Sequence, residues 1–349
     1  MIKKILFILL TGLFLSFLPF GNVIGQSSEY AQQARLFYNK ALKSIKMAQF
    51  SQANDALNMA IELDPNLAKA YIERGKVRLQ LNKLDDASAD FMKALTFNEK
   101  SGDAQFGKAY ILFLKNQYDE ALQDFTQAIA NGYMEPMVYY YRGVIRMVKQ
   151  DYTSAALDFS FSIDKKPDFA YAYHDRGSAK FKLNDLKGAQ ADYEKAIELS
   201  PKFALAYNNL GNVKKEQTDF AGAIEAYTKA IENDSDYYIA YNNRGNARYL
   251  SGDFKGAMED YNKAISFHPD YLSALNNLAV SEAKDEKYKD AMGILNKTIN
   301  LNTEFGTAYL NRGLIRELQG DLDGACSDWK IADKLGVKEA LTYLKDYQK

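Results

Sequence analysis

The chain has 349 residues, 47% of them hydrophobic, and its 44 Lys and Arg residues nearly balance its 45 Asp and Glu residues, for a formal net charge of -1. This is enough apolar material for a large ordered structure, and the lack of an overall basic field argues against nucleic acid as a partner. The single cysteine excludes a disulfide framework and a cysteine metal cluster. No cofactor is expected.

The first residues have the layout of a secretory signal peptide. Two lysines precede a 16-residue apolar run, Ile5–Phe20, and small residues lead up to Gly25. We therefore predict that residues 1–25 are a signal peptide cleaved near Gly25–Gln26, and that the mature protein is exported to the periplasm or secreted, without membrane insertion. The alternative is an uncleaved N-terminal membrane anchor, although a membrane span needs about 20 apolar residues.

The rest of the chain has apolar residues at helical spacing, with no long alternating strand pattern. This pattern repeats every 34 residues, in nine tandem units over residues 34–339, without insertion or deletion. The units begin at Ala34, Ala68, Gly102, Pro136, Ala170, Ala204, Tyr238, Leu272 and Gly306. Residues 26–33 are expected to lead into the first helix, and residues 340–349 to form a C-terminal capping helix.

Each unit combines small, aromatic and turn-forming residues, at positions counted here from its first residue. Position twenty is always alanine, from Ala53 to Ala325, and position eight is always Gly or Ala. Aromatic residues mostly occupy positions four and twenty-four, where they would fill the space beside these small residues. Proline closes several units, as Pro65 and Pro167 do, and would stop a helix there. Each unit is therefore predicted to be helix, turn, helix.

This pattern resembles the tetratricopeptide repeat, a 34-residue unit with the same order of large, small, aromatic and closing residues. The resemblance covers residues 34–339, with departures at Gln105 and Leu275, which replace the aromatic residue at position four. It implies an all-α fold, an α-solenoid of helix-turn-helix repeats forming a right-handed superhelix. By the same resemblance, the first helix of each unit would line the concave side and the second helix the convex side.

A basic residue at position seven is matched by aspartate at position twenty-three. The pairs are Arg74 with Asp90, Lys108 with Asp124, Arg142 with Asp158, Arg176 with Asp192, Arg244 with Asp260, and Arg312 with Asp328. Units with leucine at position seven are apolar at position twenty-three, and only Lys40 with Ala56 departs from the rule. Since the two positions lie on different helices, each pair is predicted to bridge its hairpin. A basic stripe for phosphate is the alternative.

His174 raises the question of catalysis, because Asp175 and Arg176 follow it and this trio would suit proton transfer. The equivalent stretches of other units keep the Tyr, Arg and Gly but not the His and Asp. No second imidazole and no cysteine nucleophile is near, and nothing completes a triad with Ser178. The chain is therefore predicted not to be an enzyme, and His174, at position five, to be a residue of the groove wall.

The positions predicted to face the groove fall into two sections. Units three to five contribute an aromatic section, which comprises Phe106, Tyr110, Met137, Tyr140, Tyr171 and His174. Units six to eight contribute an amide section, which comprises Asn208, Asn212, Asn242, Asn246 and Asn276. Amides can pair with a peptide backbone irrespective of its sequence, and aromatic side chains supply anchoring area. The alternative is that both sets only fill space between adjacent helices.

Two functions follow from these patterns. The first is a non-enzymatic protein–protein interaction scaffold of the cell envelope, which binds an extended peptide or protein segment in its concave groove. The second is an accessory protein for carbohydrate binding or envelope polysaccharide assembly, since aromatic and amide side chains also suit sugars. Peptide and sugar both stay open at this point, as does the oligomeric state.

Overall fold

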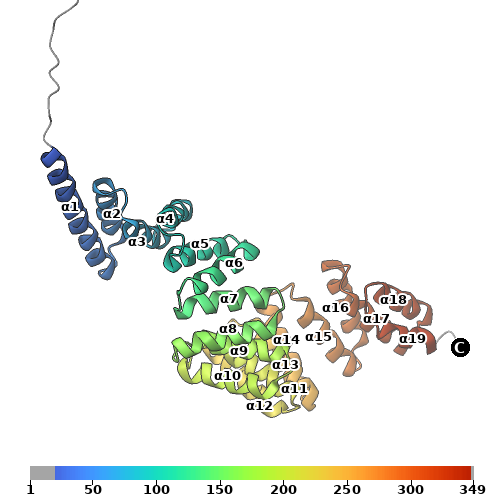
Figure 1. Ribbon diagram of the computed structural model, residues 1–349. Helices are drawn as coiled ribbons and strands as arrows, with labels where there is room; N and C mark the ends of the chain where they lie inside the picture. The colour runs from blue at the N-terminus through green and yellow to red at the C-terminus, as the bar shows by residue number, and fades with distance from the viewer. Residues whose placement is uncertain (1–19, 347–349) are drawn as a thin grey trace, which may run out of the picture. The chain divides into compact units, whose positions relative to one another are not determined.

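The computed structural model describes residues 20–346, and side chains from residue 29 onward. Over this range the chain forms nineteen helices and no strand (Figure 1), so the predicted all-α solenoid of helix-turn-helix repeats is confirmed. Most of the predicted signal peptide lies outside the described residues, and its cleavage stays a prediction. No helix in the described range is both long and apolar enough to cross a membrane.

The first helices of the units begin where the repeat register places them, except in the first unit. They are α1 (Phe20–Lys46), α3 (Ala68–Gln80), α5 (Gly102–Leu114), α7 (Pro136–Val148), α9 (Ala170–Lys182), α11 (Ala204–Glu216), α13 (Tyr238–Ser251), α15 (Leu272–Lys284) and α17 (Gly306–Leu318). Residues 26–33, expected to precede the first helix, belong to α1 itself. The segment from Gln26 to Lys46 contains no proline or glycine, the residues that most readily interrupt a helix, so α1 continues through it.

The second helices follow after short turns. They are α2 (Phe50–Leu63), α4 (Leu84–Phe97), α6 (Tyr118–Ala130), α8 (Tyr152–Lys165), α10 (Leu186–Leu199), α12 (Phe220–Asn233), α14 (Phe254–Phe267), α16 (Tyr288–Leu301) and α18 (Leu322–Lys334). A final helix, α19 (Ala340–Asp346), packs on α18, where the Tyr343 ring stacks on Trp329 at 5.2 Å between centroids. It occupies the place predicted for the capping helix.

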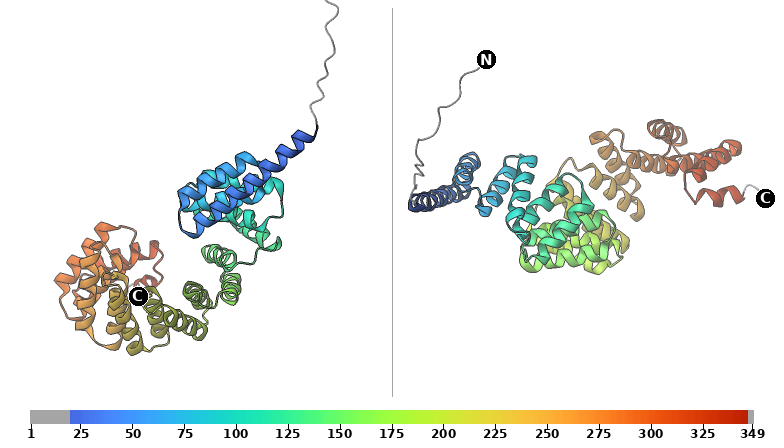
Figure 2. Two further views of the ribbon diagram at one scale, coloured as in Figure 1. Left: turned by 90° about the vertical axis from the view of Figure 1, so that its left-hand side faces the viewer. Right: turned by 45° about the horizontal axis from the view of Figure 1, so that its top comes forward.

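The chain divides into two compact parts, an N-terminal body up to Met134 and a C-terminal body from Glu135 onward. Within each body, every helix packs against the next helix along the chain. In the C-terminal body the helices follow one another in chain order along a curved stack (Figure 2). The core of each body is therefore shared between neighbouring units, as expected where one helical hairpin cannot bury its own apolar face.

The small and aromatic positions explain how the two helices of a unit pack. All nine alanines at position twenty are fully buried, and so are the large side chains at position twenty-four. At Gly245, a Cβ would lie 2.6 Å from the Tyr261 ring, and at Gly211 it would lie 2.5 Å from the Tyr227 ring. A larger residue at either glycine would push the two helices apart. This close crossing brings positions seven and twenty-three within reach of each other.

The turn between the two helices has the same backbone in every unit. Its residue at position fifteen has a positive φ in all nine units, from 55° at Ala48 to 92° at Gly252. Asparagine and glycine, which tolerate this conformation best, occupy five of these nine positions. An aspartate at position sixteen then caps the second helix in five units, as Asp253 does by accepting from the Gly256 amide at 2.9 Å. The positive φ at position fifteen and the aspartate cap at position sixteen together fix the angle between the two helices of the hairpin.

Candidate functional site

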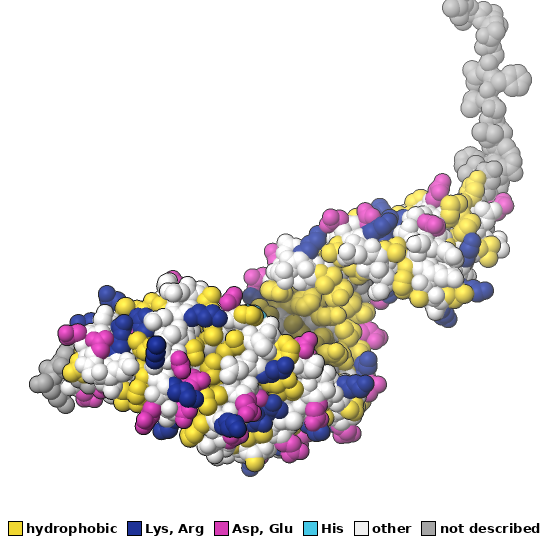
Figure 3. Space-filling view, turned by 180° about the vertical axis from the view of Figure 1, so that it is seen from behind, with side chains coloured by type: hydrophobic (Ala, Val, Ile, Leu, Met, Phe, Trp, Pro, Cys, Tyr) yellow, Lys and Arg dark blue, Asp and Glu magenta, His cyan; other side chains and the backbone are white. Residues whose placement is uncertain are grey.

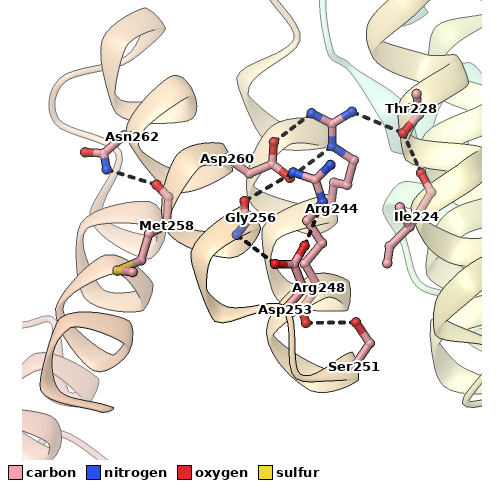
Figure 4. A network of polar contacts seen from close by, with 10 residues as sticks. All are labelled: Ile224, Thr228, Arg244, Arg248, Ser251, Asp253, Gly256, Met258, Asp260 and Asn262. Atoms are coloured by element: carbon pink, nitrogen blue, oxygen red, sulfur yellow. Dashed lines mark hydrogen bonds and ion pairs between the residues drawn. The ribbon is translucent and has the colours of Figure 1, made fainter. Parts of the chain in front are cut away.

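Each predicted hairpin pair lies within ion-pair distance. The five arginines reach their aspartates at 2.6–2.7 Å, and Lys108 reaches Asp124 at 2.9 Å. Arg244 is typical, because its Nε and Nη2 atoms donate to the two carboxylate oxygens of Asp260 at 2.9 and 2.7 Å (Figure 4). The aspartates of the five arginine pairs are buried, so a counterion is required to keep them charged.

Position eleven supplies a second cation to each of these five aspartates, which the sequence reasoning missed. In unit seven, Arg248 donates to Asp260 at 2.9 Å and to the backbone carbonyl of Gly256 at 3.2 Å (Figure 4). The other members are Arg78 with Asp90, Arg146 with Asp158, Lys180 with Asp192, and Arg316 with Asp328, at 2.7–2.9 Å. The signal was a basic residue at position eleven in each unit that pairs an arginine with an aspartate.

The position-seven arginines also connect neighbouring units. Arg244 Nη1 donates to Thr228 Oγ1 of the preceding unit at 3.1 Å (Figure 4). Its guanidinium also lies 5.5 Å from the centroid of the Tyr241 ring. Arg176 makes the same two contacts with Ser160 and Tyr173. These guanidinium groups are engaged on three sides, so the observations favour the structural pair over the phosphate-binding stripe.

The three position-five asparagines of the amide section are buried, which corrects the expectation that position five faces an open groove. Asn208, Asn242 and Asn276 are only 3–6% exposed. Each one is covered by an asparagine at position six of the next unit, 35 residues on. Asn243 donates to Asn208 at 3.0 Å, and Asn277 donates to Asn242 at 3.0 Å. Asn311 donates to Asn276 at 2.8 Å. These amides therefore form a ladder between units, and they are not free to pair with a peptide backbone.

The two remaining residues of the amide section are partly buried at position nine. The hydroxyl of Tyr227 donates to Asn212 at 2.8 Å, and that of Tyr261 donates to Asn246 at 2.8 Å. Both tyrosines occupy position twenty-four of their own units, so these bonds tie the first helix to the second. Burial raises the pKa of both tyrosines.

His174 belongs to the same ladder. Its Nδ1 atom lies 2.8 Å from Asp175 Oδ1, and its Nε2 atom lies 2.9 Å from Asn209 Nδ2. The ring is buried and packs on Phe203, at 5.0 Å between centroids. Ser178 donates to the backbone carbonyl of His174, not to its ring. Because both ring nitrogens are occupied within the chain, His174 is neither an exposed groove residue nor placed for proton transfer to a substrate.

No metal centre emerges either. Among the described residues, no group of three or more His, Cys, Asp or Glu side chains is placed to hold a metal ion.

The aromatic section is divided between the two bodies. In the N-terminal body, the Phe106 ring stacks on Tyr110 at 6.2 Å and on Tyr133 at 4.7 Å. In the C-terminal body, Met137 is partly buried and Tyr140 donates to Asp175 at 2.8 Å. Burial, followed by the nearby Asp175 carboxylate, raises the pKa of Tyr140.

Tyr171, 58% exposed, is the member of the aromatic section that is most open to solvent in the C-terminal body. Its ring lies 4.9 Å from that of Phe203. The aromatic section thus mostly fills space between helices, and one ring of this body remains available to a partner.

Two adjoining recesses lie on the first helices of units six to nine. The proximal recess, of about 240 Å³, is lined by Lys215, Asn246, Tyr249, Leu250, Tyr261, Asn277 and Val280. The distal recess, of about 220 Å³, is lined by Tyr249, Val280, Ala283, Lys284, Asn311, Leu314, Ile315 and Leu318. They share Tyr249 and Val280, so they form one surface across α11, α13, α15 and α17. Of the predicted groove residues only Asn246 lies here.

Charges of both signs are mixed on part of the protein surface. On the face seen in Figure 3, Lys and Arg side chains alternate with Asp and Glu side chains, and hydrophobic side chains gather in patches between them. Such a face has no broad basic field of the kind that nucleic acid binding requires.

Comparisons with known proteins agree with this architecture. A family model described as tetratricopeptide repeat matches residues 72–132, 106–168 and 209–271, and one described as TPR repeat matches residues 177–218. Over 84 residues the chain is 38% identical to the DnaJ protein P58IPK homolog of Arabidopsis thaliana, covering 24% of this chain and 16% of that protein. It is also 38% identical over 84 residues to the peptidyl-prolyl cis-trans isomerase FKBP4 of Bos taurus, covering 23% of this chain and 18% of that protein. The chain thus spans less than a fifth of either relative, 16% and 18%.

Two solved structures are similar in fold. Yeast Tom70 aligns at 16% identity with a TM-score of 0.50, over 94% of both chains. The C-terminal part of a TPR repeat-containing protein from Cytophaga hutchinsonii aligns at 20% identity with a TM-score of 0.54, over 68% of this chain and 98% of that one. At these identities the likeness concerns the fold alone.

Proposed function

Because this chain is built from tetratricopeptide repeats, we propose that it is a non-enzymatic interaction scaffold that holds a segment of a partner protein on the first helices of its C-terminal body. Repeats of this kind present extended surfaces, on which successive helices contribute to one binding site. The proposal replaces the predicted amide section with the proximal and distal recesses as the place of contact.

The observation that supports this proposal most is the contrast between paired polar groups and open apolar ones on the same helices. The amide ladder and the hairpin pairs are satisfied within the chain, as Asn277 and Arg244 illustrate. Leu250 and Leu318, at the rim of the recesses, are nevertheless 55% and 64% exposed. A contiguous apolar surface of this kind is typical of a protein interaction site. The carbohydrate alternative has less support, since most of the aromatic section is stacked within the chain.

We further propose that the scaffold works outside the cytoplasm, in the cell envelope. The support is the apolar run after two lysines at the N-terminus, which has the layout of a cleaved signal.

The function is tested by replacing the rim leucines. Leu250→Glu with Leu318→Glu places charges on the recess surface, while Leu157→Glu, on the second helix α8 and 57% exposed, is a matched control. Proteins captured from the organism's envelope fraction would be compared by mass spectrometry. We expect the double variant to lose a partner that the wild type and the control both retain. Full retention by the double variant would contradict the proposed function.

A further inference from the structure

Each recess is lined by one positively charged side chain. Lys215 lines the proximal recess and Lys284 the distal recess, and no carboxylate lines either one. Lys284 is exposed, and within the part of the chain that the structure describes it has no ion-pair partner. The carboxylate near Lys215 is that of its exposed chain neighbour Glu216, at 3.9 Å.

These two lysines differ from other cations on the first helices. Lys108 and Lys180, for example, lie 2.9 and 2.8 Å from an aspartate of the second helix in their own unit. Where position twenty-three is aspartate, the repeat therefore places a counterion for cations at positions seven and eleven. It places none for Lys215 at position twelve or Lys284 at position thirteen. Their charges are available to a ligand.

Apolar side chains occupy the space between the two lysines. Tyr249 and Val280 are common to both recesses, and Leu314 continues the apolar surface onto α17. Leu250 and Leu318 form its exposed rim. A partner with apolar side chains at this point would remove the rim leucines from water, which favours association.

The side-chain NH2 groups of the two asparagines Asn277 and Asn311 already donate within the chain, which reduces their part in recognition. Asn277 donates to both Asn242 and Asn246, at 3.0 and 2.9 Å. Asn311 donates to Asn276 at 2.8 Å. Polar selection of a ligand at this surface is therefore left mainly to the two lysines.

We propose that the segment bound here is acidic and apolar, with hydrophobic side chains in the two recesses and Asp or Glu side chains paired with Lys215 and Lys284. This rests on the proposed function and adds the chemical class of the partner. Charge complementarity supports this class, since an apolar surface that carries two lysines and no carboxylate favours a segment of opposite charge. Binding is then expected to weaken as salt concentration rises.

The test uses three fluorescein-labelled synthetic peptides that share two leucines and differ only in the residues around them, which are Glu, Ser or Lys. Fluorescence anisotropy with the full chain would measure the affinity of each peptide. We expect the Glu peptide to bind most tightly and to lose affinity in added salt. Lys215→Glu with Lys284→Glu should weaken it by about tenfold or more and make the Lys peptide the preferred ligand.

A matched control reverses two exposed lysines on the second helix α16, Lys289→Glu with Lys297→Glu, and should leave the ranking of the peptides unchanged. If the Ser or Lys peptide binds the wild type as tightly as the Glu peptide, the partner class is wrong and the proposed function stands. If no peptide binds and the rim-leucine variant keeps every captured protein, both fail. If the wild type forms a dimer in sedimentation that the rim-leucine variant does not, the occupant is a second copy and the proposal is overturned.

Discussion

Arg176 reaches across its own hairpin to Asp192, with Nε and Nη2 donating to the two carboxylate oxygens at 2.9 and 2.7 Å. Lys180 approaches the same carboxylate at 2.8 Å. The aspartate is buried, while the two cations are partly exposed. Each such aspartate therefore needs two cations from the first helix, and these ion pairs hold the two helices of the unit together.

The first prediction is that the aspartate of this cluster contributes more to the free energy of unfolding than the arginine does. Asp192→Ala leaves two cations without their counterion and should lower the free energy of unfolding by about 3 kcal/mol. Arg176→Leu leaves Lys180 to neutralise Asp192 and should cost about 1 kcal/mol. Urea unfolding followed by circular dichroism would measure both, with amide exchange in α9 and α10 as the local readout.

The double variant is the control for this prediction. Arg176→Leu with Asp192→Ala copies unit six, where Leu210 and Ala226 pack at the same positions. We expect it to be more stable than Asp192→Ala alone. A double variant as unstable as the sum of the two single variants would show that the side chains are not coupled.

The second prediction concerns the amide ladder. Removing one of its asparagines should lower the free energy of unfolding. Asn276→Ala removes the acceptor of Asn311 and should cost about 1–2 kcal/mol, because a partly buried amide loses its partner. Asn242→Ala should cost less, since Asn277 still donates to Asn246. Thermal unfolding of the two variants would compare them. Equal losses, or none, would mean that the ladder does not stabilise the contact between units.

The third prediction is that the fold is sensitive to high pH. Burial is the largest cause that raises the pKa of Tyr193, to about 12, and burial also raises the pKa of Tyr227. A folded-state pKa above the unfolded value of about 10 means that the folded protein keeps the proton longer. The stability from this effect is therefore fully present below about pH 10 and is lost as pH rises through the folded-state pKa.

Ultraviolet absorbance of tyrosinate, recorded together with circular dichroism during an alkaline titration, would check this behaviour. We expect the buried tyrosines Tyr193 and Tyr227 to ionise only as the helices unfold, at a pH above the unfolded-state value of about 10. Complete tyrosine ionisation near pH 10 with the helices intact would contradict the predicted protection.

The fourth prediction concerns export. Intact-mass measurement on protein purified from the envelope fraction should find a species that begins near Gln26. A full-length species that stays in membranes after washing with high salt would instead support the alternative of an N-terminal anchor.

The regular parts of the fold could be predicted from one sequence because the same residue pattern recurs at the same positions in all nine units. Position seven and position twenty-three vary together within this chain, so the hairpin pairs could be predicted without a structure. The second cation, such as Arg248, was missed because Arg244 already accounted for the charge of Asp260. Pairing across units was missed for a different reason. Position five is covered by position six of the next unit, and that contact depends on how closely neighbouring hairpins stack.

The recesses were harder still to predict. Val280 and Leu314 occupy position nine of adjacent units, where unit seven has Asn246, so no repeated residue type indicates a binding surface. Their shared surface arises only when the four first helices α11, α13, α15 and α17 lie side by side.

Site-specific photo-cross-linking in living cells tests the proposed binding surface most directly. A benzophenone amino acid would replace Leu250 or Leu318 at the recess rim and, as the control, Leu157 on α8. We expect irradiation to join a partner protein to the chain at positions 250 and 318, and not at position 157. Cross-linked partners at position 157, with none at either recess position, would contradict the claim that this protein holds its partner on the first helices of its C-terminal body.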